Sequence, residues 1–316
     1  MSLDSKLNID PTSVKSNIVD FLRSTLEKRD IDGLLVLYKD CIESLTNIHL
    51  AIEAVGRKNV KILVTKGRSL NRQPRETMDV KAVNKYIQLP TKNIVFANQE
   101  GSLNEIRKIF SEGIEIKFRG PYSDIVPRSL NYNLSYLLLR EIARDEIEHK
   151  KYSPPTKKPM SRRDIFIQKT IAHYKSQIRF RVLLAFFLAE SENSSFMGSV
   201  NKTEWLLGLF TKFGSYHAAD FLPLASLYRT QVIQLGNHFG LQDFLKSKKH
   251  QTPTSYKYFF DIPAEDVDRI LVRLELDYSF DKIFSDTNIP KEAIEKVNYY
   301  YLASDYARNV PLIPKL

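Results

Sequence analysis

The chain has 316 residues, 43% of them hydrophobic, which is enough for the core of one large domain or two ordinary ones. No apolar run approaches the roughly 20 residues that a membrane span needs, and the amino-terminal residues MSLDSKLNID contain no apolar segment of a secretory signal. The single cysteine, Cys41, excludes an intrachain disulfide and a zinc site built from cysteines, so we expect a cytoplasmic protein.

The net charge of +10 favours polyanionic partners, and one segment supplies much of it. Residues 150–163, KKYSPPTKKPMSRR, carry six positive charges, no negative charge and three prolines, which is typical of a solvated linker or an exposed insertion. No aromatic and basic RNA-binding signature and no zinc-finger spacing accompany this charge. We therefore do not expect a nucleic acid as the main partner.

The first hundred residues alternate between helical and strand patterns. Helical patterns lie at residues 14–22, 45–55 and 79–86. Short apolar runs typical of buried strands lie at residues 34–38, 60–64 and 93–97. Gly56 is expected to end the second helix as a C-cap. Because strand, helix and strand follow one another with short connections, we predict a doubly wound, Rossmann-like α/β fold with a parallel five-stranded sheet and helices on both faces.

The second half is mainly helical in pattern. Long helical patterns at residues 128–148 and 164–190 precede SSFMG (194–198), which is the last expected core strand. Asn201 is then the expected N-cap of a helix, with Glu204 at N3, where a carboxylate can reach back to the cap. Further helices are expected near 225–239, 263–275 and 290–304, mostly as surface and tail. We expect one domain over residues 1–316, with a helical and basic insertion at about 120–177.

The stretch from Phe196 to Gln231 is dense in groups that handle phosphates and metal ions. It resembles the second signature block of ammonia-dependent NAD synthetases, which adenylylate nicotinic acid adenine dinucleotide with ATP and then amidate it. In that family's GTxxxxE motif the threonine contacts ATP and the glutamate binds magnesium. The equivalents here are Gly198, Ser199 and Glu204. The resemblance therefore implies ATP and Mg²⁺ as cofactors and nicotinic acid adenine dinucleotide or NAD as the small-molecule partner.

The same resemblance implies a dinucleotide site. The family's FTKYG pattern appears as FTKFG, with Lys212 in the substrate-contacting position, and Asp220 matches another such position. Arg179 matches the substrate contact of the ARxRM motif, and Arg308 is the one basic residue that remains of a carboxy-terminal HKR. Arg229 replaces a lysine that usually meets ATP. Taken one at a time, such residues are more often solvated surface charges, so their order and spacing support the assignment.

The pyrophosphate-binding loop has lost its usual residues. The family places SGGxDS after the first strand, with two glycines around the pyrophosphate and an aspartate on magnesium, whereas this chain has KDCIES from Lys39 to Ser44. Both glycines are absent, and Asp40 adds a negative charge that Lys39 only partly offsets. Glu43 could hold magnesium from a longer side chain. An ordinary strand-to-helix turn is the alternative reading of this loop, and Cys41, as a lone buried cysteine, is not expected to be a nucleophile.

A third block is also altered. Where the family carries a threonine followed by acidic residues, this chain has KKHQTPTSYKYFFDI (248–262), so that Thr252 or Thr254 stands in for the threonine. The acidic residues have become Tyr256, Lys257, Tyr258 and Phe259.

These observations favour a NAD synthetase homologue with little or no synthetase activity that still binds a dinucleotide. The residues assigned to ATP are Lys39, Ser44, Ser199, Arg229 and Thr252. Those assigned to magnesium are Glu43 and Glu204, and those assigned to the dinucleotide are Arg179, Lys212, Asp220 and Arg308. Two alternatives stay open: a working, divergent synthetase that uses Lys39 and Arg229 in place of backbone amides, and an RNA-associated adenylating protein that uses the basic insertion.

We also expect a homodimer. The family resembled here forms two-fold dimers, and a two-fold pair is the commonest closed assembly. The helical segment VLLAFFLAE (182–190) has large apolar residues on nearly every side, more than one surface helix normally buries.

Overall fold

The computed structural model describes residues 3–39, 41–66, 80–98, 162–243 and 260–309. Its helices and strands, in chain order, are η1 (Leu3–Leu7), α1 (Pro11–Arg29), β1 (Gly33–Leu37), α2 (Ile42–Val55), η2 (Arg57–Asn59), β2 (Val60–Lys66), α3 (Val80–Ile87), η3 (Thr91–Asn93), β3 (Ile94–Asn98), α6 (Arg162–Glu190), β4 (Ser194–Met197), α7 (Lys202–Leu207), α8 (Ser215–Ala218), α9 (Arg229–His238), α12 (Ala264–Leu274), α13 (Phe280–Thr287), α14 (Lys291–Ala303) and α15 (Asp305–Arg308).

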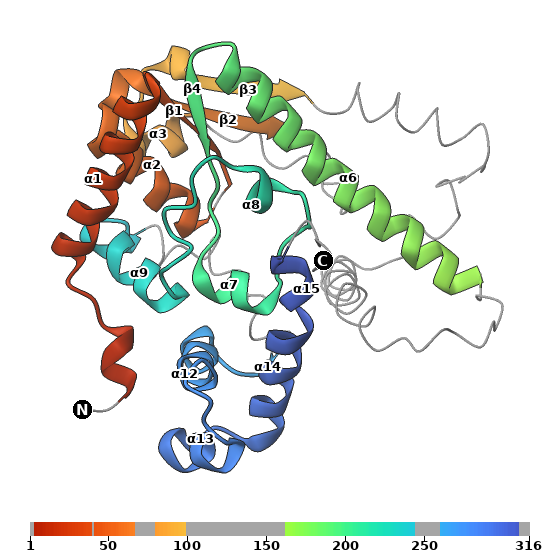
Figure 1. The fold of residues 1–316 in the computed structure, drawn as a ribbon. Coiled ribbons are helices and arrows are strands. Elements are labelled where there is room, and N and C mark those ends of the chain that lie inside the picture. Colours follow the sequence, from red (N-terminus) through yellow and green to blue (C-terminus); the bar gives the residue numbers. More distant parts are fainter. Residues whose placement is uncertain (1–2, 40, 67–79, 99–161, 244–259, 310–316) are drawn as a thin grey trace, which may run out of the picture.

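The described strands form one parallel sheet in the order β3-β2-β1-β4 (Figure 1). Val36 of β1 lies opposite Ile62 of β2 and Met197 of β4, so the central strand is paired on both sides. The sequence-based strand positions are confirmed. The described part of the sheet has four strands, one fewer than the five expected.

Helices cover both faces of this sheet, as expected. Successive residues of a strand point to opposite faces. Leu34 and Val36 belong to one apolar cluster with buried residues of α1, α2 and α9. Leu35 and Leu37 belong to a separate cluster with buried residues of α6, which crosses the other face (Figure 1). The central strand β1 is apolar along its whole length because both of its faces are buried. The doubly wound fold is confirmed.

The carboxy-terminal helices form a second core. Val267 and Ile270 of α12 and Ile294 and Val297 of α14 are fully buried in a cluster that also includes Leu206 of α7. The expectation that these helices are mostly surface and tail is therefore wrong. A periodic apolar stripe shows that a helix buries one face, but not which helix it buries that face against. Figure 1 shows α12, α13 and α14 together below the sheet, next to α7.

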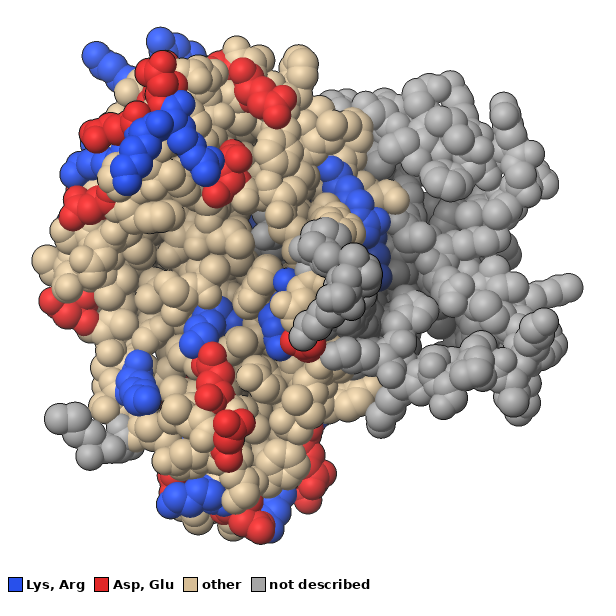
Figure 2. All heavy atoms as spheres, viewed as in Figure 1, with Lys and Arg blue, Asp and Glu red and all other residues tan. Residues whose placement is uncertain are grey.

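The expected helix at 164–190 is confirmed as α6, whereas the helical pattern at 128–148 and most of the insertion at 120–177 lie outside the described residues. None of the described helices combines the length and the apolar character that crossing a membrane requires. On the face shown in Figure 2, the described residues carry acidic and basic side chains side by side, above all at the two ends of the molecule. Mixed charge of this kind is typical of an ordinary solvated surface.

Candidate functional site

Three helices begin close together at the carboxyl ends of β1 and β4. Helix α2 starts after β1 and α7 starts after β4, and the first turn of α9 contacts both. In open α/β sheets, ligands bind beyond the carboxyl ends of the strands, where helix amino termini favour negative charge. This region is the candidate site.

A buried ion pair stands at the centre of the site. The carboxylate of Glu43, in the first turn of α2, pairs with the guanidinium of Arg229, the first residue of α9. The Glu43 side chain is 4% exposed and that of Arg229 is 16% exposed. The same carboxylate oxygen of Glu43 accepts a hydrogen bond of 3.0 Å from the side-chain amide of Asn201. Charge-assisted hydrogen bonds of this kind are the stronger ones in proteins, and here they tie α2 to both α7 and α9.

Glu204 lies beside this pair. Asn201 and Glu204 form the predicted capping box, in which the Asn201 side chain accepts the Glu204 N–H at 2.9 Å. Burial is the main cause that raises the pKa of the Glu204 carboxyl to about 7, and the negative charge of Glu43 raises it further. The positive charges of Lys39 and Arg229 act in the opposite direction. Glu204 therefore shares its surroundings with Glu43, Lys39 and Arg229, and it is partly protonated near neutral pH.

The loop between β1 and α2 is closed by its own hydrogen bonds. The hydroxyl of Ser44 accepts the backbone N–H of Lys39 at 3.0 Å, and the N–H of Cys41 donates to the Lys39 carbonyl at 2.9 Å. Cys41 is the N-cap of α2 in an extended conformation and makes no side-chain cap bond. Burial raises the pKa of the Cys41 thiol far above its usual range, so the cysteine is not an activated nucleophile. Asp40 lies outside the described residues.

Ser199 is held from α2. The side-chain amide of Asn47 donates to the Gly198 carbonyl at 2.8 Å and to the Ser199 hydroxyl at 3.3 Å. Both Asn47 and Ser199 are buried. Ser199 therefore belongs to the same group of side chains as Glu43 and Glu204. Thr252, the remaining residue assigned to ATP, lies outside the described residues.

The residues assigned to the dinucleotide lie in two places. The exposed guanidinium of Arg179, on α6, donates to the Lys212 carbonyl at 3.2 and 3.0 Å, so these two cationic residues are neighbours. The Lys212 ammonium lies 5.3 Å from the centre of the Phe213 ring. Asp220 has a structural contact, because its carboxylate accepts the N–H of Phe196, in β4, at 2.8 Å.

Arg308 is used within the fold. Its guanidinium donates to the Leu206 carbonyl at 2.6 Å and the Tyr301 carbonyl at 3.1 Å, which joins α15 to α7 and α14. Burial lowers the pKa of Arg308 from its ordinary value. The ring of His217, in α8, contacts the Ala307 carbonyl at 2.6 Å and thereby connects the Lys212 side of the site to α15.

The carboxylates assigned to magnesium do not fit such an ion in this arrangement. Glu43 is engaged by the Arg229 guanidinium and the Asn201 amide, and Glu204 caps its own helix. Magnesium demands a near-octahedral set of oxygen ligands. Among the described residues, no group of three or more His, Cys, Asp or Glu side chains could hold a metal ion. The cation that faces Glu43 in this structure is the guanidinium of Arg229.

The sequence of this chain matches the model of a known protein family. The family model described as NAD synthase matches residues 142–311, slightly more than half of the chain. The chain belongs to the NAD synthase family. The resemblance inferred from the signature blocks is thus confirmed.

Curated NH(3)-dependent NAD(+) synthetases are similar to this chain, some along nearly its whole length and others over less than half of it. The NH(3)-dependent NAD(+) synthetase of Thermotoga neapolitana is 24% identical over 315 residues, which cover 95% of this chain and 96% of that protein. The protein of the same name from Rhizobium meliloti is 25% identical over 309 residues, which cover 92% and 87% of the two chains. The protein of the same name from Mannheimia succiniciproducens is 31% identical over 138 residues, which cover 43% and 51%.

Solved structures show the same fold. An NMN synthetase from Francisella tularensis superposes with a TM-score of 0.64 at 16% identity and covers 98% of this chain and 100% of its own. An NH3-dependent NAD synthetase from Campylobacter jejuni gives a TM-score of 0.63 at 16% identity with the same coverage. The arrangement of sheet and helices is therefore that of the NAD synthase family.

Sequence reasoning missed several residues that shape the site. Asn47 follows Glu43 by one helical turn, so the spacing of four residues was a usable signal that both lie on one face of α2. His217, Thr203 and Asp268 carry no such signal, because their partners lie far away in the sequence.

Proposed function

We propose that this member of the NAD synthase family has weak or no synthetase activity and binds a dinucleotide, either nicotinic acid adenine dinucleotide or NAD. The observation that carries this proposal is the buried ion pair of Glu43 and Arg229. It engages the carboxylate that the family resemblance assigns to magnesium.

The energetics of the ion pair argue against easy entry of a metal ion. Separating Arg229 from Glu43 would leave a buried carboxylate without its partner, which typically costs about 3–5 kcal/mol. A magnesium ion that enters must displace the guanidinium from Glu43 and must find the oxygen ligands of a near-octahedral set that the two glutamates do not supply. Adenylyl transfer requires that the pyrophosphate be neutralised and held by metal and oriented donors. In the loop from Lys39 to Ser44, the Lys39 N–H bonds to the Ser44 hydroxyl and the Cys41 N–H bonds to the Lys39 carbonyl, so these donors are already used within the loop.

A dinucleotide site is supported by different residues. Arg179 of α6 and Lys212 of the loop between α7 and α8 are neighbours, because the Arg179 guanidinium donates to the Lys212 carbonyl, and a guanidinium and an ammonium together suit a diphosphate. Arg308 and His217 hold α7, α8 and α15 together around this region. Asp220, which follows α8, accepts the N–H of Phe196 and so fixes this segment against β4.

The decisive experiment separates turnover from binding. Purified protein is incubated with ATP, nicotinic acid adenine dinucleotide, magnesium and ammonia, and the NAD formed is measured, while calorimetry measures binding of both dinucleotides. We expect NAD formation near background and saturable binding that Arg179→Ala weakens about tenfold or more, since a charge-assisted phosphate contact is worth about 1.5–3 kcal/mol. Arg29→Ala, at the exposed end of α1, is the matched control and should bind normally.

Each of the other results has a definite meaning. Robust NAD formation by the unmodified protein would contradict the loss of activity and favour a divergent synthetase. Absence of dinucleotide binding up to millimolar concentration, or binding indifferent to Arg179→Ala, would leave a structural homologue without this ligand.

A further inference from the structure

A fully buried aspartate lies behind the candidate site. Asp268, on α12, is 0% exposed. Its carboxylate accepts three hydrogen bonds: from the Thr203 hydroxyl of α7 at 2.5 Å, from the Thr230 backbone N–H of α9 at 2.9 Å and from the Thr230 hydroxyl at 2.8 Å. A buried carboxylate is costly unless such partners satisfy it. Asp268 is satisfied only while α7 and α9 keep this arrangement.

The Thr203 hydroxyl connects Asp268 to Arg229 through two hydrogen bonds. The Thr203 hydroxyl donates its proton to Asp268 and accepts the backbone N–H of Arg229 at 2.9 Å. Because Thr230 follows Arg229 in the chain, two consecutive backbone N–H groups at the start of α9 are held, one by Thr203 and one by Asp268. The first turn of a helix has unpaired N–H groups, and their partners fix its position. The backbone of Arg229 is thus fixed by residues of α7 and α12.

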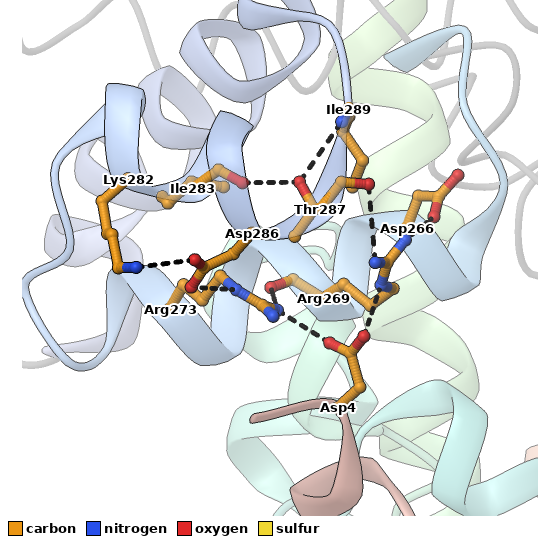
Figure 3. A network of polar contacts seen from close by, with 9 residues as sticks. All are labelled: Asp4, Asp266, Arg269, Arg273, Lys282, Ile283, Asp286, Thr287 and Ile289. Carbon is orange, nitrogen blue, oxygen red and sulfur yellow. Dashed lines mark hydrogen bonds and ion pairs between the residues drawn. The ribbon is translucent and has the colours of Figure 1, made fainter. Parts of the chain in front are cut away.

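Helix α12 is itself anchored away from the site. Figure 3 shows Arg269 and Arg273 of α12 reaching Asp4 of η1, at 3.2 and 2.9 Å, while Arg273 also faces Asp286 of α13 at 3.7 Å. Arg269 pairs with Asp266 at 3.0 Å in the same network. These contacts hold α12 against η1 and α13, in addition to its packing against α7. Asp268 therefore lies on a helix that ion pairs hold at positions away from the site.

We propose that Asp268 is a positioning residue that, with Thr203, holds the start of α9 so that the Arg229 guanidinium stays on Glu43. This inference rests on the proposed function in one respect, because the Glu43–Arg229 pair is the feature that replaces a metal ion there. When the acceptor at Asp268 is lost, the amino terminus of α9 loosens and Arg229 leaves Glu43 more often.

The test measures hydrogen exchange at the Arg229 side chain by NMR and needs no ligand. The Nη–H resonances of Arg229, whose Nη1 pairs with Glu43, are identified in a ¹H–¹⁵N spectrum by their disappearance in Arg229→Met, and their hydrogen exchange rate is then measured in each variant. Asp268→Asn keeps the size of the side chain but turns an amide group toward the donors. We expect about tenfold faster exchange, the effect of losing roughly one hydrogen bond to a charged group.

Matched variants separate positioning from general destabilisation. Thr203→Val removes only the linking hydroxyl and should also accelerate exchange, whereas Thr203→Ser keeps the hydroxyl and should restore the slow rate. Asp281→Asn breaks the exposed ion pair between Asp281 of α13 and Lys291 of α14, which takes no part in these contacts, and should leave the Arg229 rate unchanged. If Asp268→Asn does not fold, Thr203→Val and Thr203→Ser decide the question. Unchanged exchange in the folded Thr203→Val protein would overturn the inference.

Failure of the positioning role of Asp268 can be distinguished from failure of the proposed dinucleotide binding. If no dinucleotide binds but Arg229 exchange responds as described, the positioning role stands and the binding proposal fails. If a dinucleotide binds but Arg229 exchange is the same in Asp268→Asn and Thr203→Val as in the unmodified protein, the positioning role fails alone.

Discussion

Replacing Arg229 by methionine should turn the Glu43 site into one that responds to divalent cations. Methionine keeps a side chain of similar length but removes the guanidinium that pairs with Glu43. The Glu43 side chain, which is 4% exposed, then retains only the Asn201 amide among its two contacts described above. A second carboxyl, that of Glu204, lies close enough for the charge of Glu43 to raise its pKa. Two neighbouring carboxyl groups without a cation between them are an attractive place for Mg²⁺ or Mn²⁺.

The expected change in the free energy of unfolding follows from the burial of the Glu43–Arg229 ion pair. Removal of one partner of a buried ion pair destabilises a protein by about 3–5 kcal/mol, so urea unfolding of Arg229→Met without metal should show a loss of this size. A ligand at one hundred times its dissociation constant stabilises the folded state by about 2.7 kcal/mol. Millimolar Mg²⁺ or Mn²⁺ should therefore recover a large part of the loss in the variant and change the unmodified protein little.

Two control variants test whether the unpaired Glu43 carboxylate causes the response to divalent cations. Arg229→Lys keeps a cation opposite Glu43 and should remain indifferent to Mg²⁺. The double variant Glu43→Gln with Arg229→Met has no unpaired charge, so it should be more stable than Arg229→Met and show no metal response. A folded Arg229→Met protein that is destabilised but gains nothing from Mg²⁺ or Mn²⁺ would refute the reasoning, as would an equal metal response of the unmodified protein.

Three further predictions concern the carboxyl group of Glu204, the exposed face of α6 and the loop of residues 39–44. Because the folded-state pKa of Glu204 is raised from 4.5 to about 7, its contribution to stability is present at low pH and is lost as pH rises through this window. The free energy of unfolding of the unmodified protein, measured in urea relative to Glu204→Gln, should therefore decline between these two pH values by at most about 1.4 kcal/mol per pH unit. An increase over this range would contradict the assignment. Leu183 and Phe187, one turn apart on α6, are 62% and 71% exposed, so light scattering should find a dimer that Leu183→Glu with Phe187→Glu converts to a monomer, and a monomeric unmodified protein would contradict this. Restoring glycine at Asp40 and Cys41 together with Glu43→Asp should improve ATP binding in calorimetry, and no gain in a folded protein would show that more than the loop has been lost.

The sequence was sufficient for features that depend on neighbouring residues. Each core strand is a short apolar run between turn residues, and the Asn201–Glu204 capping box connects positions three apart. Gly56 ends α2 with a φ of 77°, in the region that glycine enters without strain. These features are local, so their physics can be read from the order of residues.

Features that join distant segments could not be predicted in this way. Glu43 and Arg229 are 186 positions apart, and Thr203 and Asp268 are 65 apart. The resemblance suggested that Arg229 takes the place of a lysine that meets ATP, but the structure places its guanidinium on Glu43. The role of Asp268 was likewise invisible, because a charged residue in an amphipathic helix is expected to be solvated.

The substitutions at the site form one consistent electrostatic arrangement. In the family's loop, backbone amides next to glycines face the pyrophosphate, and a magnesium ion balances the nearby carboxylates. Without those glycines the amide and hydroxyl groups of the loop bond to one another, as Lys39 and Ser44 do. The carboxylate of Glu43 remains buried beside Glu204, and a buried negative charge needs a cation. Arg229 provides that charge from a backbone position that Thr203 and Asp268 fix. The changed loop and Arg229 thus complement each other. Without Arg229 the buried Glu43 carboxylate would lose its ionic partner, and without Glu43 the Arg229 guanidinium would lose a hydrogen-bond acceptor.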